Sequence, residues 1–294
     1  MTFSPDAISQ GSPNVSKPSK PRMSTRNRLL FFVTGWLIVL MPFLFWWNTW
    51  FGRQLSNQQL AEYLQDQKHP RHIQHALVQI GERMTRHDPS VTQWYPQVVQ
   101  LASYPVEEVR NTDAWVMGQD TSGSGFHQSL LKMLADRSLM VRGNAALSLV
   151  RFGDATGRPE ILQLLQSATI TAPHAGKLID TSSVGTAIRQ GGIVATFQDG
   201  SQITEIRSPI SGRLRALSAS TGQTVAAGAR IAEIDPSTEQ AWEALRALYL
   251  IGQPSDIAAV LPYERELPDI PDHIRKQAIE TEKAIRQRET PGGQ

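Results

Sequence analysis

Hydrophobic and polar residues follow several different patterns along the 294-residue chain. Residues 1–28 have no apolar period and are rich in Ser, Pro, Lys and Arg, which predicts a disordered tail. Residues 29–51 are uncharged and mostly apolar, and apolar residues at helical spacing come after them. In residues 170–236, short apolar alternations between glycines predict strands. Helical spacing returns over 237–288, and a short disordered tail is predicted at 289–294. The patterns predict an α+β fold whose helices are interrupted by an all-β segment.

The uncharged segment 29–51 is long enough to cross a hydrocarbon core of about 30 Å as a helix. Five basic residues precede this segment: Lys17, Lys20, Arg22, Arg26 and Arg28. After it, Arg53 alone follows closely. This bias predicts a single-pass helix in the inner (cytoplasmic) membrane, with a cytoplasmic N-terminus and a periplasmic or extracytoplasmic body from residue 52 onward. A cleaved signal peptide is the alternative, although its apolar core is normally shorter. The basic tail has a second reading, as a lipid-binding arm.

A helical repeat follows the apolar segment. Residues 109–120 (VRNTDAWVMGQD) and 141–154 (VRGNAALSLVRFGD) both begin with Val-Arg, continue with small and apolar residues and reach a glycine turn. Residues 73–82 (IQHALVQIGE) are a weaker earlier copy, and the spacing of roughly 32–37 residues favours stacked helix pairs. Arg110 and Arg142 are therefore expected to lie at the same place in successive units. Residues 58–168 resemble HEAT repeats, which predicts a HEAT-like α-solenoid over 52–169.

The same helical pattern recurs near the carboxyl end, in residues 242–257 and 274–288. Ile274-Arg275 stands where the earlier copies have Val-Arg. We therefore predict C-terminal HEAT-like helices over 237–288 that continue one array. Two independent helical domains are the alternative.

The all-β segment contains two copies of one unit. Residues 170–200 and 206–237 align end to end with one extra residue, Thr221, in the second copy. Matched glycines (Gly176 with Gly212, Gly185 with Gly222) predict matching turns, because positive φ is easily reached only by glycine. A pseudo-twofold is expected to bring six apolar residues into one core: Leu178, Ile188, Val194, Leu214, Val225 and Ile231.

This duplicated unit resembles the biotinyl/lipoyl-like barrel-sandwich hybrid domain, in which a tight hairpin between the halves carries a modified lysine. Counting back from Pro209 places that position at Ser201, beside an expected two-residue turn at Asp199-Gly200. Ser201 has no amine to acylate, and Lys177, the segment's only lysine, lies far from the hairpin. The resemblance therefore implies the carrier fold without a covalent cofactor.

The stretch SPISGRLRALSASTGQTVAAGARIAEID (208–235) is also similar to membrane fusion proteins, the periplasmic adaptors of secretion and efflux systems. Those proteins likewise begin with an uncleaved inner-membrane helix. Most of them carry a coiled-coil hairpin between the half-motifs, where this chain has only residues 201–205. The resemblance implies an adaptor that assembles partners at the inner membrane.

Candidate catalytic chemistry is sparse. His69, His72 and His75 are spaced three apart, so two of them could reach a metal ion, but no carboxylate has a compelling spacing; we therefore predict ordinary helix surface or packing, with a metal site as the alternative. Pro70 predicts that a helix begins there, with His69 outside it. Ser122 and Ser124 lie in a glycine-containing loop without phosphate-loop or nucleophile-elbow context. The chain also has no cysteine, which excludes disulfides and thiolate sites.

Two further sets of residues have structural interpretations. Asp120, Asp136 and Asp154 end or flank helical units, which predicts capping. Aromatic residues at helical spacing predict core positions, with a partner-binding groove as the alternative; they are Trp94, Tyr95 and Trp115.

These patterns predict a non-catalytic adaptor or scaffold, anchored in the membrane lipid bilayer and binding protein partners. Transporter or membrane-complex subunits are the partners that the resemblance suggests, in secretion or efflux. The formal net charge of +2 gives no nucleic-acid signature. The alternative function is an accessory structural subunit of a membrane enzyme or electron-transfer complex. No catalytic residue, cofactor or metal is predicted.

Overall fold

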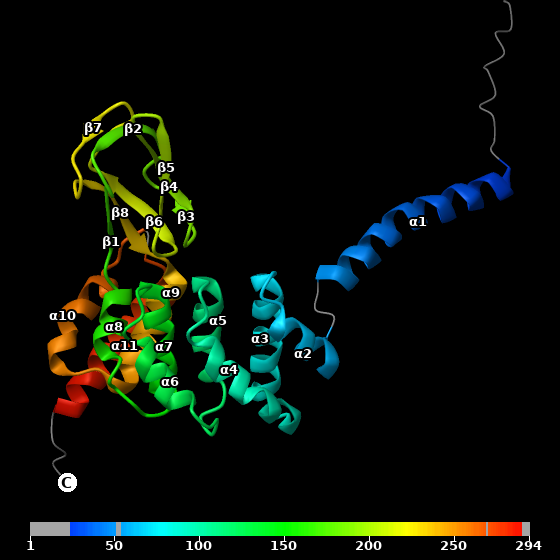
Figure 1. Cartoon of the computed structure of the whole chain (residues 1–294), viewed down its shortest axis with the longest axis horizontal. Helices are drawn as coiled ribbons and strands as arrows, with labels where there is room; N and C mark the ends of the chain where they lie inside the picture. Colours follow the sequence, from blue (N-terminus) through cyan, green and yellow to red (C-terminus); the bar gives the residue numbers. More distant parts are fainter. Residues whose placement is uncertain (1–23, 51–53, 269, 290–294) are drawn as a thin grey trace, which may run out of the picture. The chain divides into compact units, whose positions relative to one another are not determined.

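The computed structural model describes residues 24–50, 54–268 and 270–289 (Figure 1). The chain divides into two compact units, with the boundary between Gln54 and Leu55. The described residues form eleven α-helices, three short 3-10 helices and eight strands in two antiparallel sheets. This confirms the α+β class.

The first unit contains one helix, α1 (Thr25–Trp50). It begins inside the predicted disordered tail, so that prediction is wrong for residues 25–28, while residues 1–23 lie outside the described residues. Within the described part of the chain, no helix meets the length and apolarity needed to cross a membrane. The anchor predicted over 29–51 gains no support from that search. Within this segment the side chains of residue 39 and of residues 42–50, and the whole of residue 51, lie outside what is described.

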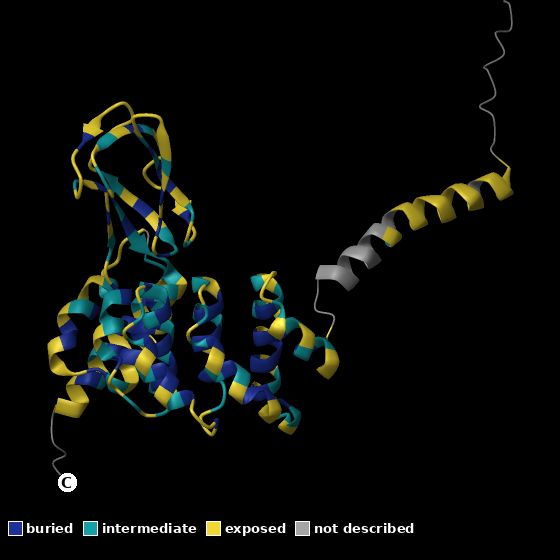
Figure 2. Cartoon of the chain, viewed as in Figure 1, coloured by how far each residue is buried: buried dark blue, intermediate teal, exposed yellow. Residues whose placement is uncertain are grey.

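The second unit opens with helices that pack side by side. Helices α3, α5 and α7 are successive neighbours, with α2 against α3 and α6 against α7. Figure 2 shows buried residues concentrated along these neighbouring helices. The bounds are α2 (Asn57–Gln65), α3 (Pro70–Thr85), η1 (Pro89–Trp94), α4 (Tyr95–Leu101), α5 (Glu107–Met117), α6 (Phe126–Met133), α7 (Leu139–Arg151) and α8 (Arg158–Leu164).

The helices after the strands pack directly on those before them. Helix α9 contacts α7, α8 and α11, and one apolar core contains residues from both sides of the strands. The side chain of Gln240 donates to the carbonyl oxygen of Leu164 at 2.9 Å, and Arg158 pairs with the buried Asp256. The bounds are α9 (Thr238–Ile251), η2 (Pro254–Asp256), α10 (Ile257–Val260), η3 (Leu261–Glu264) and α11 (Asp272–Glu289).

The strands form two four-stranded sheets of equivalent topology, with the orders β1-β8-β6-β3 and β5-β4-β2-β7. Exchanging each strand for the one four positions away converts one order into the other, as a pseudo-twofold requires. The strands are β1 (Ala168–Thr171), β2 (Gly176–Thr181), β3 (Ala187–Ile188), β4 (Ile193–Asp199), β5 (Gln202–Arg207), β6 (Gly212–Leu217), β7 (Thr224–Val225) and β8 (Arg230–Pro236). We call residues 168–236 the β unit. The six predicted apolar residues all lie in its shared core.

The matched glycines are required for different physical reasons. Gly185 and Gly222 have φ of 87° and 91°, which confirms the predicted positive-φ turns. The prediction was wrong for Gly212, which is not among the positive-φ residues: a Cβ there would lie 1.8 Å from the carbonyl oxygen of Asp235, so close strand approach requires glycine. The hairpin turn also differs by one residue, since Asp199 pairs with Gln202 and the turn is Gly200-Ser201.

Candidate functional site

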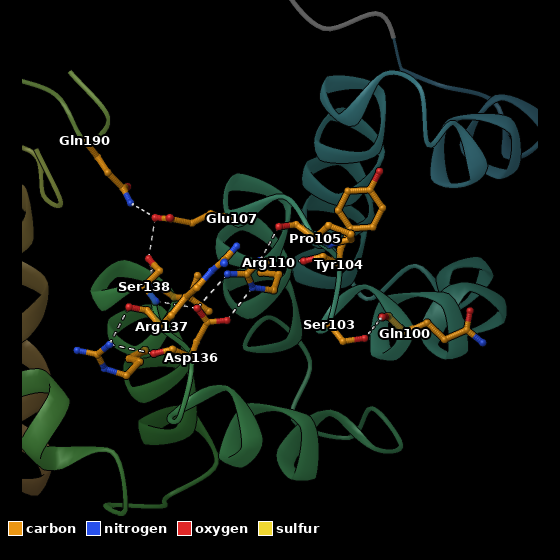
Figure 3. A network of polar contacts seen from close by, with 12 residues as sticks. Gln100, Ser103, Tyr104, Pro105, Glu107, Arg110, Asp136, Arg137, Ser138 and Gln190 are labelled. Atoms are coloured by element: carbon orange, nitrogen blue, oxygen red, sulfur yellow. Dashed lines mark hydrogen bonds and ion pairs between the residues drawn. The ribbon is translucent and has the colours of Figure 1, made fainter. Parts of the chain in front are cut away.

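The junction between the helices and the β unit contains a polar network (Figure 3), which we call the junction network. Arg110 on α5 donates from Nε to Asp136 Oδ2 at 2.6 Å and from Nη2 to Oδ1 at 3.0 Å. Its Nη1 donates to the carbonyl oxygens of Tyr104 and Pro105. The Arg110 and Asp136 side chains are 7% and 11% exposed. A bidentate, largely buried pair of this kind fixes the turn before α7 against α5.

The two charges perturb each other. The hydrogen bonds to Asp136 raise the pKa of Arg110 further. Burial by itself raises the pKa of Asp136, but the Arg110 hydrogen bonds and the Ser138 backbone N–H outweigh it, so the pKa is below its ordinary value. Both groups are therefore charged at neutral pH.

Glu107 extends the junction network to the β unit. Its Oε1 accepts from the Ser138 hydroxyl at 2.7 Å and from Gln190 Nε2 at 2.8 Å. Gln190 lies between β3 and β4, and its own backbone N–H donates to Ser211 Oγ. Apolar contact accompanies these bonds, because Leu139 and Met140 of α7 pack against the core of the β unit. The β unit is thus held on the helices by side chains as well as by its two chain connections.

A cavity of about 640 Å³ opens beside the Arg110–Asp136 pair. Its lining includes apolar Val99, Ala102 and Met133 together with basic Lys132 and Arg137. The cavity therefore combines an apolar wall with basic side chains.

The neighbouring helices α5 and α7 use their arginines in the same way. Arg110 and Arg142 each donate from Nη1 to the carbonyl oxygens six and five residues earlier. Arg142 then pairs with Glu160 at 2.7 Å, as Arg110 pairs with Asp136. The expected equivalence of these two arginines is confirmed. Arg275 differs, since it pairs with the nearby Asp272 on its own helix.

The three inter-helix aspartates stabilise turns instead of capping helices, so that prediction was wrong in detail. Each accepts the backbone N–H two residues later: Asp120 from Ser122, Asp136 from Ser138 and Asp154 from Thr156. Each also accepts from a side chain of an earlier segment; these donors are Tyr95, Arg110 and His127. The sequence pattern identified the aspartates, but not these second partners.

The aromatic residues are not all core residues. Trp94 and Tyr95 are buried, as predicted. Trp115 is partly exposed and lies over Gly81 of the neighbouring helix, where an added Cβ would be 2.8 Å from the indole ring. The prediction of a core position is therefore wrong for Trp115, because α5 turns this face away from the main core.

The histidines near the start of α3 meet a carboxylate that sequence reasoning missed. Asp66 Oδ2 lies 2.7 Å from His72 Nδ1 and 2.9 Å from His69 Nδ1. His75 is outside this group and lies against Gln79, with 3.0 Å between the two nitrogens. His69 is the N-cap residue and Pro70 the first helical residue, which confirms the predicted helix start. The spacing Asp-x-x-His-x-x-His was the available signal.

The residues at which carrier-lysine or serine-nucleophile chemistry was considered and not predicted lie on the surface. Ser201 is exposed in the β4–β5 turn, and Lys177 is exposed on β2, paired in register with Gln198 and Thr224. The Ser122 hydroxyl donates to Asp120 at 2.6 Å. Ser124 is exposed in the same loop.

Comparisons with known proteins identify no family. Neither the models of known families nor the curated proteins contain a match to this chain. Among solved structures, a single-chain, multi-domain long-chain acyl-CoA carboxylase is similar over 37% of this chain at 17% identity, with a TM-score of 0.24. The chain spans about a tenth of that protein's length, since 10% of it is covered. An engineered protein is similar over 78% of this chain and 80% of its own, at 16% identity and a TM-score of 0.38. Similarities this low carry no argument about function.

Proposed function

We propose that this protein is a membrane-anchored, non-catalytic adaptor or scaffold that holds two binding surfaces in a fixed relation. One surface belongs to the stacked helices, which we interpret as HEAT-like, and the other to the β unit, which we interpret as an adaptor-type barrel-sandwich hybrid. The observation that carries the proposal is the junction network, in which Glu107 accepts from both Ser138 of the helices and Gln190 of the β unit.

A fixed junction suits a scaffold because partners can bind both surfaces without the cost of ordering a hinge. The two chain connections add to this stiffness, since β1 and β8 pair antiparallel where the chain enters and leaves the β unit. The cavity with Lys132 and Arg137 then offers a contact for an acidic or amphipathic partner segment. Solenoid faces commonly provide extended binding surfaces of this kind.

The anchor and the location belong to the same proposal. They rest on the uncharged segment 29–51 and on the basic residues before it. A reporter fused after Gln294 is expected to be active only outside the cytoplasm. Reporter activity in the cytoplasm would overturn the orientation.

Quantitative co-purification in mild detergent tests the scaffold function. Wild-type chain is compared with Lys132→Glu/Arg137→Glu, which reverses the charge of the cavity. The matched control is Lys276→Glu/Lys283→Glu on α11. We expect a stoichiometric protein partner that is lost with the cavity variant and kept with the control. A partner unaffected by both variants would exclude the cavity as the contact, and no stoichiometric partner at all would refute the scaffold function.

The second candidate function is an accessory subunit of a membrane enzyme or electron-transfer complex. The same co-purification separates the two, since transporter or outer-membrane proteins favour the adaptor and redox or enzyme subunits favour the accessory role.

A further inference from the structure

Three potential metal ligands converge where α2 meets α3. Asp66 follows the last residue of α2, His69 precedes α3, and His72 lies in the first turn of α3. One carboxylate oxygen and one nitrogen from each ring all lie within 4.8 Å of one another. The side chains are 27%, 63% and 43% exposed in chain order, so the group is open to solvent on one side.

The ligand atoms are close to the spacing that a metal ion requires. Zinc bonds of about 2.0–2.1 Å in a tetrahedral site separate neighbouring ligand atoms by about 3.4 Å. Asp66 Oδ2 lies 2.7 Å and 2.9 Å from the two Nδ1 atoms, so these gaps need to widen by about 0.5–0.7 Å. Rotation of exposed side chains supplies a movement of that size without a change in the backbone.

The local structure orients all three groups before any ion binds. The ring of His72 stacks on Tyr63, with 4.4 Å between the ring centres and 12° between the planes. The backbone N–H of Asp66 donates to the Tyr63 carbonyl, and the backbone N–H of His69 donates to the Asp66 carbonyl at 3.1 Å. The turn therefore presents the carboxylate and both imidazoles to one point.

We propose that Asp66, His69 and His72 form a binding site for a first-row divalent cation such as Zn²⁺. Two imidazoles and one carboxylate are ligands that zinc accepts, and three protein ligands leave a position for water or for a group from a partner. Each imidazole must present an unprotonated nitrogen to the ion, so the hydrogen bonds from the two rings to Asp66 are replaced by bonds to the metal and the protons pass to solvent. The carboxyl end of α2 favours a cation and the amino end of α3 opposes it, so the side chains decide the affinity.

The test is a zinc titration of the full chain, purified in mild detergent without a histidine tag, in competition with a chromophoric chelator. We expect one equivalent of Zn²⁺ to bind. Asp66→Asn, His69→Gln and His72→Gln are each expected to weaken binding at least tenfold. His75→Gln is the matched control, because this residue lies on the same helix but outside the group, and it is expected to leave binding unchanged.

Cobalt provides a second readout on the unmodified chain. Co²⁺ bound by the three side chains is expected to give a visible d–d absorption band that an equivalent of Zn²⁺ removes. Less than half an equivalent of bound zinc, or an equal loss of binding in the His75 and His72 variants, would overturn the site. Unchanged binding in Asp66→Asn would likewise overturn the proposed ligand set. Far-UV circular dichroism of each variant without metal establishes that the helices are intact.

Discussion

Replacing Arg110 by Met is expected to be strongly destabilising. The substitution leaves the Asp136 carboxylate largely buried with only the Ser138 backbone N–H among its present partners. It also leaves the carbonyl oxygens of Tyr104 and Pro105 without their shared donor. Breaking a buried pair by removing one partner costs about 3–5 kcal/mol of the free energy of unfolding. With an m-value of about 3 kcal/mol per M, the urea midpoint falls by about 1–1.7 M.

Urea denaturation of the full chain, followed by circular dichroism at 222 nm, measures this loss. The matched control is Arg246→Met, since Arg246 and Glu243 form an exposed pair at 3.6 Å that is worth less than about 1 kcal/mol. Adding Asp136→Asn to Arg110→Met is expected to restore part of the stability, because a neutral amide is less costly to bury than an unpaired carboxylate. Equal midpoint shifts for the Arg110 and Arg246 variants would refute the reasoning.

The pH dependence gives an independent check on the same pair. The pKa of Asp136 is lower in the folded than in the unfolded chain, so its contribution to stability is fully present above its unfolded pKa of about 3.9. That contribution is lost as the pH falls through the folded pKa. The difference between wild type and Arg110→Met is therefore expected to shrink in acid. A difference that is constant from neutral pH to acid would contradict this assignment.

Three other variants test separate parts of the fold. Gly212→Ala is expected to destabilise the β unit by several kcal/mol, because the added Cβ would overlap the carbonyl of Asp235 on β8. Gly185→Ala is expected to cost only about 1–2 kcal/mol of backbone strain, because Gly185 has a positive φ and open space around it. Equal melting temperatures for the two variants would contradict this difference. Asp113 is fully buried with neither carboxylate oxygen hydrogen-bonded in the described structure, and burial raises its pKa well above the ordinary value. Ionisation of Asp113 in the unfolded chain thus reduces stability as the pH rises above about 4, so Asp113→Asn should raise the urea midpoint at neutral pH and not in acid. Gln190→Ala is expected to speed amide hydrogen exchange between β3 and β4 without lowering the global free energy of unfolding by more than about 1.5 kcal/mol; unchanged exchange would show that this contact does not hold the β unit.

The sequence alone determined the parts of the fold that depend on local periodicity. Alternating apolar residues between matched glycines predicted a duplicated β unit, and the six residues expected in its core are all there. The repeated Val-Arg likewise predicted the equivalence of Arg110 and Arg142, since a residue at the same place in a repeated helix meets the same backbone. Periodicity specifies which face of an element is buried, and repetition specifies that two elements share an environment.

Tertiary structure decided which polar groups meet, because periodicity does not encode the partner that a face will contact. Asp136 lies 26 residues from Arg110, and Gln190 lies 83 residues from Glu107, so no local spacing relates them. Asp66 was within range of His69 and His72 in the sequence, yet only the turn between α2 and α3 directs its carboxylate to both imidazoles. Gly212 shows the same limit, since the carbonyl that excludes a side chain belongs to Asp235 on a neighbouring strand, and the pairing of β6 with β8 places it there.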